Sequence, residues 1–208
     1  GKISLAFFKR GQKVRVPIDG CELAFPAINE TAKKVLDWIN STQMTMRNLK
    51  AVIIRSNQKG ETIAGLFIKD KITFDDYPKL DKSFIGFNLY YSTHKSPASV
   101  ITEVLYKEGQ DFLIEEITGK RFKYGINSFF QVNIPVFEMA LKDISSFLSK
   151  KDDIVDIYSG VGSIGLCVGA NQLIESNQEA VDFANENVVL QDIVGAQNFA
   201  SSFNYKTP

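Results

Sequence analysis

The sequence is poor in the residues that build metal sites and disulfide frameworks. Its 208 residues include two cysteines, Cys21 and Cys167, and a single histidine, His94. Two cysteines do not make a disulfide scaffold, so we expect a protein of the reducing cytoplasm. Without a second histidine, a zinc-type metal site and a Ser-His-Asp triad are both disfavoured. We interpret His94, which lies in a polar stretch, as a surface residue.

The sequence also lacks an excess of charge and a long apolar run. Lysine and arginine together number 24, as do aspartate and glutamate, so overall charge favours no polyanionic partner and a nucleic-acid site must rest on local clusters. No run approaches the ~20 apolar residues of a membrane span, so we expect no membrane partner. The start, Gly1-Lys2-Ile3, shows no signal peptide and reads as the middle of a protein.

The clearest pattern runs from residue 153 to residue 187 and predicts a strand, a glycine-rich turn, a short helix, a second strand and a second helix. The apolar run from Ile154 to Ile157 is suited to a buried parallel strand. Three glycines follow at G-x-G-x-x-G spacing: Gly160, Gly162 and Gly165. Glycines at this spacing let the backbone turn tightly and approach a ligand closely. The unit therefore predicts a site for a nucleoside-bearing cofactor.

Two carboxylates bear on which cofactor this is. Glu175 ends the second apolar run, where a carboxylate usually accepts hydrogen bonds from ribose hydroxyls. Asp156 lies four residues before Gly160, where it suits the amino group and sulfonium of S-adenosylmethionine (SAM) but would repel the pyrophosphate of a dinucleotide. The glycine spacing also matches the dinucleotide fingerprint, so an NAD-dependent oxidoreductase stays an alternative, as does a turn with no ligand.

The first part of the chain predicts an α+β module of mostly antiparallel strands. An amphipathic helix is expected over residues 26–40, with Trp38 flanking the core. The expected strands cover residues 2–8, 13–18, 49–55, 62–68, 84–91, 100–106, 110–117 and 121–124. A helix over residues 135–148 then leads into the glycine-rich unit. We therefore divide the chain into a module of residues 1–125 and a second domain of residues 126–208.

Two groups of cations lie on predicted hairpins. The first group is Lys9, Arg10, Lys13 and Arg15, and the second is Lys120, Arg121 and Lys123. One interpretation of the first group is a solvated edge whose charges discourage aggregation. The other is a strip that contacts the phosphates of a nucleic acid, and the same interpretation applies to the second group.

The order GKRFKYGINSFFQVN, a helix, DIYSGVGSIGL and IESNQEAVDFANEN resembles the RNA 5-methyluridine methyltransferases. These SAM-dependent enzymes methylate carbon 5 of uridine in ribosomal or transfer RNA. The resemblance covers residues 103–202 well and the earlier residues loosely, and its S-F-F-Q-V-N element is more specific than the glycine loop. It implies an α/β fold: the start of a class I SAM-methyltransferase (Rossmann-like) sheet, preceded by a central α+β module that faces RNA. It also implies SAM as cofactor and rRNA or tRNA as partner, and we expect a cytoplasmic monomer.

The resemblance assigns cofactor contacts to seven residues: Gln131, Asp156, Tyr158, Gly160, Gly162, Ser163 and Glu175. It implies that Gln131 reaches the cofactor and the uridine, that Tyr158 flanks the cofactor, and that Ser163 lies beside its carboxylate. For Ser163, capping of a helix start is an equally good explanation. Cys21 resembles the last of four cysteines that hold an iron–sulfur cluster in some members. One cysteine cannot hold a cluster, so for this chain we favour a free thiol.

In the family, a cysteine thiolate adds to carbon 6 of uracil, carbon 5 takes the methyl group, and a base then removes the carbon 5 proton. The family cysteine lies in a Ser-Cys-Asn-Pro motif that this sequence lacks, and we interpret Cys167 as a small core residue. We therefore assign no catalytic residue, expect the nucleophile and base downstream of residue 208, and expect the chain by itself to be inactive. The alternative from another class is a non-catalytic relative that binds RNA and SAM.

Overall fold

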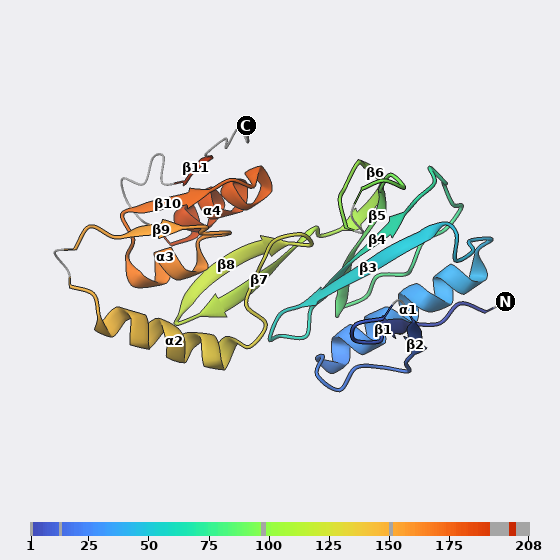
Figure 1. Ribbon diagram of the computed structural model, residues 1–208, viewed down its shortest axis with the longest axis horizontal. Helices are drawn as coiled ribbons and strands as arrows, with labels where there is room; N and C mark the ends of the chain where they lie inside the picture. The colour runs from blue at the N-terminus through green and yellow to red at the C-terminus, as the bar shows by residue number, and fades with distance from the viewer. Residues whose placement is uncertain (1, 13, 97–98, 150–151, 192–199, 203–208) are drawn as a thin grey trace. The chain divides into compact units, whose positions relative to one another are not determined.

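The structure, a computed structural model, describes residues 2–12, 14–96, 99–149, 152–191 and 200–202, the last three as backbone alone. The chain divides into two compact units, Gly1–Leu113 and Ile114–Pro208, and each is described by itself (Figure 1). This division falls before residue 125, where the sequence-based boundary lies, because strand β8 (Lys120–Gly125) packs against helix α4 (Gln178–Leu190) of the second unit.

The first unit is built on a four-stranded sheet in the order β3-β4-β5-β6. Its strands are β3 (Leu49–Ser56), β4 (Thr62–Ile68), β5 (Phe84–Tyr91) and β6 (Glu103–Gly109). The outer pairs are antiparallel, as expected, whereas the central pair β4 and β5 is parallel and is joined by the long connection of residues 69–83. All four predicted strands are confirmed, although β6 begins at Glu103 rather than at residue 100.

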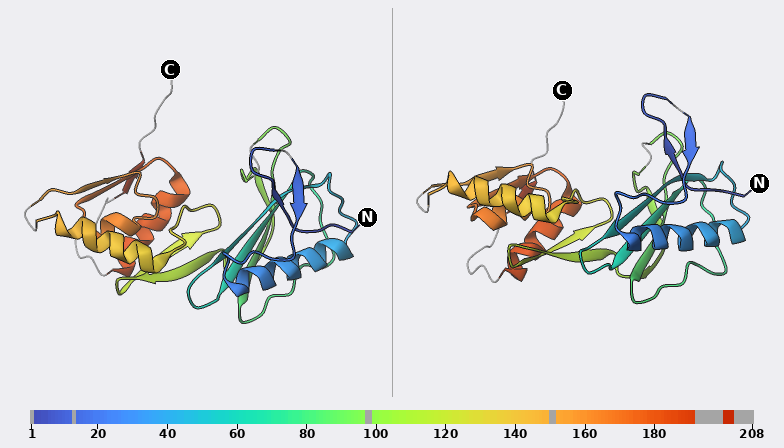
Figure 2. Two further views of the ribbon diagram at one scale, coloured as in Figure 1. Left: turned by 60° about the horizontal axis from the view of Figure 1, so that its bottom comes forward. Right: turned by 90° about the horizontal axis from the view of Figure 1, so that it is seen from below.

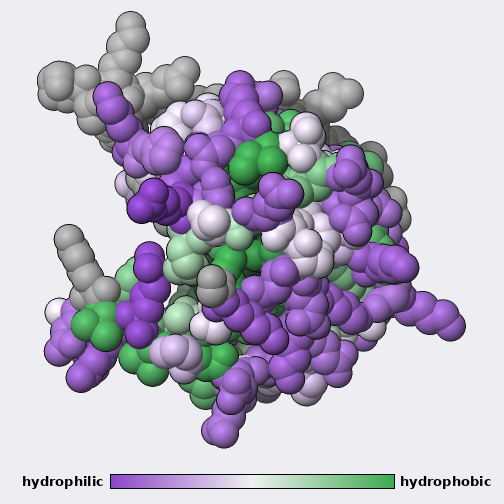
Figure 3. All heavy atoms as spheres, turned by 90° about the vertical axis from the view of Figure 1, so that its right-hand side faces the viewer, coloured by the Kyte–Doolittle hydropathy of each residue, from purple (hydrophilic) through white to green (hydrophobic). Residues whose placement is uncertain are grey.

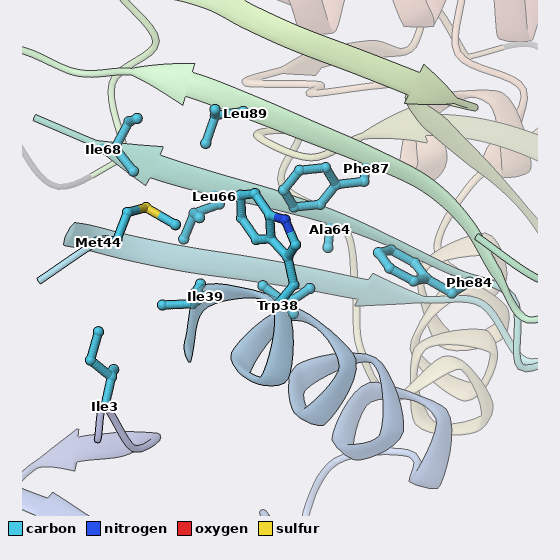
Figure 4. Close-up of a cluster of buried hydrophobic side chains, with 11 residues drawn as sticks. Ile3, Trp38, Ile39, Met44, Ala64, Leu66, Ile68, Phe84, Phe87 and Leu89 are labelled. Atoms are coloured by element: carbon cyan, nitrogen blue, oxygen red, sulfur yellow. The ribbon is translucent and has the colours of Figure 1, made fainter. Parts of the chain in front are cut away.

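Helix α1 (Pro26–Ser41) covers one face of this sheet (Figure 2). Trp38 lies in the middle of the core beneath it, 6% exposed, with its ring 5.5 Å from that of Phe87 (Figure 4). The expectation that Trp38 flanks the core was therefore wrong. The connection of residues 69–83 folds over it: the Phe74 ring lies 5.1 Å away, and the indole N–H donates to the carbonyl oxygen of Asp76 at 3.1 Å.

A short antiparallel hairpin, β1 (Ala6–Phe8) and β2 (Arg15–Pro17), precedes α1 and confirms the predicted first hairpin. Every residue of its two strands is exposed. The face of the first unit shown in Figure 3 is largely hydrophilic, with hydrophobic side chains visible in smaller patches. No helix of the described residues is both long and apolar enough to span a bilayer.

The second unit begins within β7 (Phe112–Ile117), which pairs with β8 to form the predicted hairpin about residues 118–120. Thr118 and Gly119 at its turn have φ values of 50° and 78°, the left-handed conformations of a tight two-residue hairpin. Helix α2 (Ile134–Ser146) follows, and the Asn133 side chain caps it by accepting a hydrogen bond from the Val136 N–H. The helix predicted over residues 135–148 is thus confirmed.

The rest of the second unit is a parallel three-stranded sheet in the order β11-β10-β9. Its elements run β9 (Val155–Ile157), α3 (Ser163–Val168), β10 (Gln172–Glu175), α4 and β11 (Ala200–Ser202). The predicted alternation of strands and helices is confirmed, but the expected burial of the first strand was wrong. Val155 is 44% and Ile157 62% exposed, because they lie on the face of β9 opposite to Asp156, which contacts α3, and the described residues leave that face largely uncovered.

Candidate functional site

The loop between β9 and α3 has an unusual backbone. Tyr158, Gly160 and Gly162 have φ values of 62°, 56° and 83°. The two glycines adopt this region without steric cost, whereas a tyrosine there is strained, and such strain at a loop is typical of a functional site. The Tyr158 side chain is 84% exposed, so its ring does not pack under the turn but stands free at the surface of the loop.

Glu175, at the end of β10, holds the first glycine of the loop. Its Oε2 accepts a hydrogen bond from the Gly160 N–H at 2.9 Å, and its Oε1 accepts from the backbone N–H groups of Ser176 at 2.7 Å and Asn177 at 2.8 Å. Burial acts to raise the pKa of Glu175, but the donors of Asn177, Gly160 and Ser176 outweigh it and lower the pKa. The residue is therefore a stable carboxylate, and Oε2 keeps a lone pair for a further donor.

Asp156, in the middle of β9, holds the third glycine. Its Oδ2 accepts a hydrogen bond from the Gly165 N–H at 2.8 Å. A Cβ on Gly165 would stand 2.4 Å from Cδ2 of Leu173 and 2.9 Å from this oxygen, so only glycine lets α3 approach the strands so closely. Burial raises the pKa of Asp156 and the charge of Glu175 raises it further, while the Gly165 bond opposes both. The two carboxylates thus concentrate negative potential beneath the loop.

Two polar side chains at the loop lack a partner among the described residues. The hydroxyl of Ser159 is enclosed within the unit and makes no hydrogen bond there, which is rare for a buried polar group. Gln131 is half-buried and its amide makes no hydrogen bond within the same part of the chain. The S-F-F-Q-V-N segment lies beside the loop, because the carbonyl oxygen of Phe129 is 3.9 Å from where a Cβ on Gly160 would stand.

Two residues at the loop were not expected from the sequence: Ser159 and Asn187, a completely buried residue of α4. The Asn187 amide donates to the carbonyl oxygen of Val161 in the loop at 2.9 Å and to that of Lys123 in β8 at 3.0 Å. Its Oδ1 accepts from the Lys123 N–H at 2.6 Å. One side chain therefore fixes the loop, α4 and β8 to one another. The sequence could have indicated Asn187, because it is a polar residue at an apolar-face position of a predicted helix.

Ser163 is the first residue of α3, and the N-cap position belongs to Gly162, without a side-chain cap. The capping explanation for Ser163 is therefore wrong, and its half-buried hydroxyl stays a candidate cofactor contact. Cys167 accepts a hydrogen bond from the Thr118 hydroxyl at 3.5 Å, and burial raises the pKa of its thiol. Cys21 lies in the first unit, where its N–H donates to Oδ1 of Asn29 at 2.8 Å.

The second group of cations is largely engaged within its own unit. The Lys120 ammonium donates to the carbonyl oxygen of Leu166 in α3. Lys123 pairs with Glu186 and lies over the Phe183 ring, 5.8 Å from its centroid. Arg121 is exposed and makes no ion pair among the described residues. Its side chain is therefore the one of the three that is free to meet a phosphate.

The three described cations of the first group are exposed. Lys9, Arg10 and Arg15 lie on the β1–β2 hairpin and make no ion pair among the described residues, while Lys13 falls outside them. His94 is exposed as predicted, with its Nε2 3.9 Å from Oδ1 of Asp70.

Comparison with known proteins places the chain. No family model matches it. It is 26% identical over 222 residues to an uncharacterized RNA methyltransferase of Clostridium tetani, a match that covers 93% of this chain and 47% of that protein. It is 30% identical over 120 residues to the tRNA (uracil(54)-C(5))-methyltransferase of Pyrococcus furiosus, covering 55% of this chain and 29% of that protein. The chain is a homologue of RNA methyltransferases.

A solved structure shares the fold of this chain. The structure of the Pyrococcus abyssi tRNA (uracil-54, C5)-methyltransferase, in complex with S-adenosyl-L-homocysteine, matches this chain with a TM-score of 0.74 at 20% identity. The match covers 91% of this chain and 50% of that one. It confirms the predicted α/β methyltransferase fold. The chain spans about half the length of the curated relatives it matches, 47% and 49% for two of them.

Proposed function

We propose that this homologue binds S-adenosylmethionine at the β9–α3 loop and serves the methylation of carbon 5 of a uridine in rRNA or tRNA. The observation that carries the proposal is the loop itself: a left-handed backbone at Tyr158, Gly160 and Gly162, held from below by Glu175. Relatives named RNA methyltransferases and a solved relative with bound S-adenosyl-L-homocysteine support it.

The residues present fit this cofactor. Glu175 Oε2 has room for one ribose hydroxyl besides the Gly160 N–H. The half-buried Gln131 amide, which makes no hydrogen bond among the described residues, supplies a polar group that a ligand can reach. Gly160 keeps the backbone open to close approach, while Gly162 lets the turn pack against Leu166 and Leu173. The exposed Tyr158 ring offers a flat apolar face beside the loop.

The charge of the site favours a cation over an anion. Asp156 and Glu175 both lie at the loop, and neither makes an ion pair among the described residues. The Asp156 carboxylate attracts a ligand that carries ammonium and sulfonium groups and repels a pyrophosphate, whereas a ribose-binding carboxylate such as Glu175 suits either cofactor. When bound, SAM supplies an electrophilic methyl group. The same electrostatics disfavour the NAD-dependent alternative.

Within this reaction we assign the chain the binding and orientation of its reactants. Burial raises the pKa of the Cys167 thiol and so leaves less of the thiolate, the form that attacks carbon. Cys167 is therefore unsuited to be the nucleophile. The sequence has no Ser-Cys-Asn-Pro motif to supply another. We therefore assign it no catalytic residue.

The proposal is tested by titrating S-adenosylhomocysteine into the chain in a calorimeter. Removing the Glu175 carboxylate takes away a charged acceptor worth about 1.5–3 kcal/mol, so Glu175→Ala should weaken binding about ten- to a hundredfold. Asp143→Asn, an exposed carboxylate on α2, is the matched control and should leave the affinity unchanged. Equal affinities of the Glu175→Ala variant and the parent chain would contradict the proposed ribose site.

A further inference from the structure

The segment before α1 concentrates positive charge in a chain that is neutral as a whole. Residues 1–18 contain Lys2, Lys9, Arg10, Lys13 and Arg15 and no carboxylate. The described members of this set make no ion pair within the described residues. The segment is thus a local cationic strip, which attracts a polyanion although the whole chain does not.

The hairpin also exposes apolar side chains that no part of the first unit covers. Phe7 is 57% and Phe8 63% exposed, and Val14, just before β2, and Val16, within it, are 55% and 45% exposed. In the right-hand view of Figure 2 the hairpin stands clear of α1 and of the four-stranded sheet. A two-stranded ribbon without a hydrophobic core gains little stability of its own, so these rings contribute nothing visible to folding.

The base of the hairpin is nevertheless fixed. The Asn40 side chain of α1 accepts a hydrogen bond from the Ile3 N–H at 2.8 Å and donates to the Ile3 carbonyl oxygen at 3.0 Å. The Asn29 side chain makes the same pair of bonds with Cys21, at 2.8 and 3.0 Å. The segments before and after the hairpin are therefore both hydrogen-bonded to α1, while the hairpin between them stays exposed. This arrangement presents the ribbon in a set orientation.

Each face of the ribbon carries an aromatic ring and a cation. Phe8 pairs directly with Arg15 across the strands, and the guanidinium carbon lies 5.5 Å from the centroid of the Phe8 ring. Phe7 pairs with Val16 and, because side chains alternate along a strand, faces the opposite side together with Lys9. Apolar groups spread over both faces do not suit insertion into a membrane surface, which needs them on one.

We propose that the β1–β2 hairpin binds single-stranded RNA, with bases stacking on Phe7 and Phe8 and with Lys9, Arg10 and Arg15 contacting phosphates. Exposed rings beside cations are the groups that hold unstacked nucleotides, and the bases of a duplex are not available for such stacking. The proposal rests on the proposed function only in taking RNA as the substrate. It assigns an RNA contact to the first unit, whereas the proposed cofactor loop belongs to the second unit.

The test is fluorescence anisotropy of a labelled single-stranded RNA of about 12 nucleotides, enough to span one site, and of the duplex of the same sequence. Phe8→Leu keeps an apolar side chain but loses the ring, and should weaken single-strand binding about five- to thirtyfold. Phe8→Trp should retain binding, and its fluorescence should be quenched by the RNA. The matched control is Phe25→Ala, which removes an exposed ring outside the hairpin.

Charge is tested on the same RNA across a salt series. Arg15→Gln should lower the slope of log affinity against log salt by about 0.7, the value for one phosphate contact on a single strand. Lys33→Gln, an exposed cation on α1, is the control and should leave the slope unchanged. Folding is checked by circular dichroism, and S-adenosylhomocysteine affinity should be the same for every variant.

Equal binding by Phe8→Leu, Phe8→Trp and the parent chain, with an unchanged salt slope for Arg15→Gln, would overturn the hairpin proposal while leaving the proposed function intact. The proposal would also be overturned if Phe8→Leu and Arg15→Gln lost binding to anionic lipid vesicles, or lost self-association, but kept RNA binding. The hairpin would then serve a membrane or a second copy of the chain. A chain that binds S-adenosylhomocysteine but neither RNA would overturn both the hairpin proposal and the proposed RNA substrate.

Discussion

Asn187 gives the sharpest prediction about how the cofactor loop is held. Replacing it by alanine removes three hydrogen bonds and leaves three polar backbone groups, the Lys123 N–H and the carbonyls of Lys123 and Val161, without that partner. At about 1 kcal/mol net for each bond, the loss is about 3 kcal/mol, and desolvation of the unpaired groups adds to it. Alanine's better helix propensity offsets about 0.6 kcal/mol. We expect the free energy of unfolding to fall by about 2–4 kcal/mol.

The assay is urea unfolding of the Asn187→Ala variant followed by far-ultraviolet circular dichroism. Asn185→Ala is the matched control: it makes the same change two residues away on the exposed side of α4, and should leave stability unchanged or raise it by a few tenths of a kcal/mol. The single tryptophan, Trp38, lies in the first unit, so its fluorescence reports on that unit separately. A circular-dichroism transition of Asn187→Ala that coincides with that of Asn185→Ala would refute the role given to Asn187.

Three further predictions follow from the second unit. Arg121→Gln should lower the slope of log RNA affinity against log salt by about 0.7–0.9. Lys120→Gln and Lys123→Gln should change stability more than this slope, because their ammonium groups are bound to Leu166 and Glu186. Equal slopes for the three variants would contradict a phosphate contact by Arg121. The pKa of Glu175 is lowered from 4.5, so its contribution to stability is present above about pH 4.5 and is lost as pH falls through the folded pKa. The urea midpoint of the parent chain should therefore fall more steeply from about pH 6 to about pH 3 than that of Glu175→Gln. Parallel curves of midpoint against pH would contradict this. The chain by itself should transfer no methyl group to RNA, because it has no Ser-Cys-Asn-Pro motif to supply the nucleophile and the half-buried Cys167 thiol has a raised pKa. Incorporation of labelled methyl groups from SAM would show that this is wrong.

Local patterns in the sequence predicted much of the fold because the physics that decides these elements is local. The continuous apolar runs of β4 and β5 and the periodic apolar face of α1 each coincide with an observed element. The turn at Thr118-Gly119 also follows from sequence, since a glycine there permits the left-handed backbone that a short hairpin requires. The glycine spacing and Glu175 likewise located the loop, whose contacts are between neighbours of one βαβ unit.

What the sequence did not show depends on contacts between distant segments. Trp38 is central because residues 69–83 fold over it, and nothing in the helix itself indicates that cover. Lys120 and Lys123 look like free cations until α3 and α4 supply their partners. The three bonds of Asn187 and the unpartnered hydroxyl of Ser159 are likewise tertiary facts. The exposure of Val155 and Ile157 in β9 likewise depends on what covers their face of the sheet, which the described residues leave largely open.

The central claim is that the β9–α3 loop holds a SAM-type ligand, and a paired calorimetric titration of the unmodified chain tests it most directly. S-adenosylhomocysteine and NADH are titrated under the same buffer and salt. The Asp156 carboxylate beneath the loop predicts saturable binding of S-adenosylhomocysteine and no binding of NADH. Saturable binding of NADH without binding of S-adenosylhomocysteine would contradict the claim.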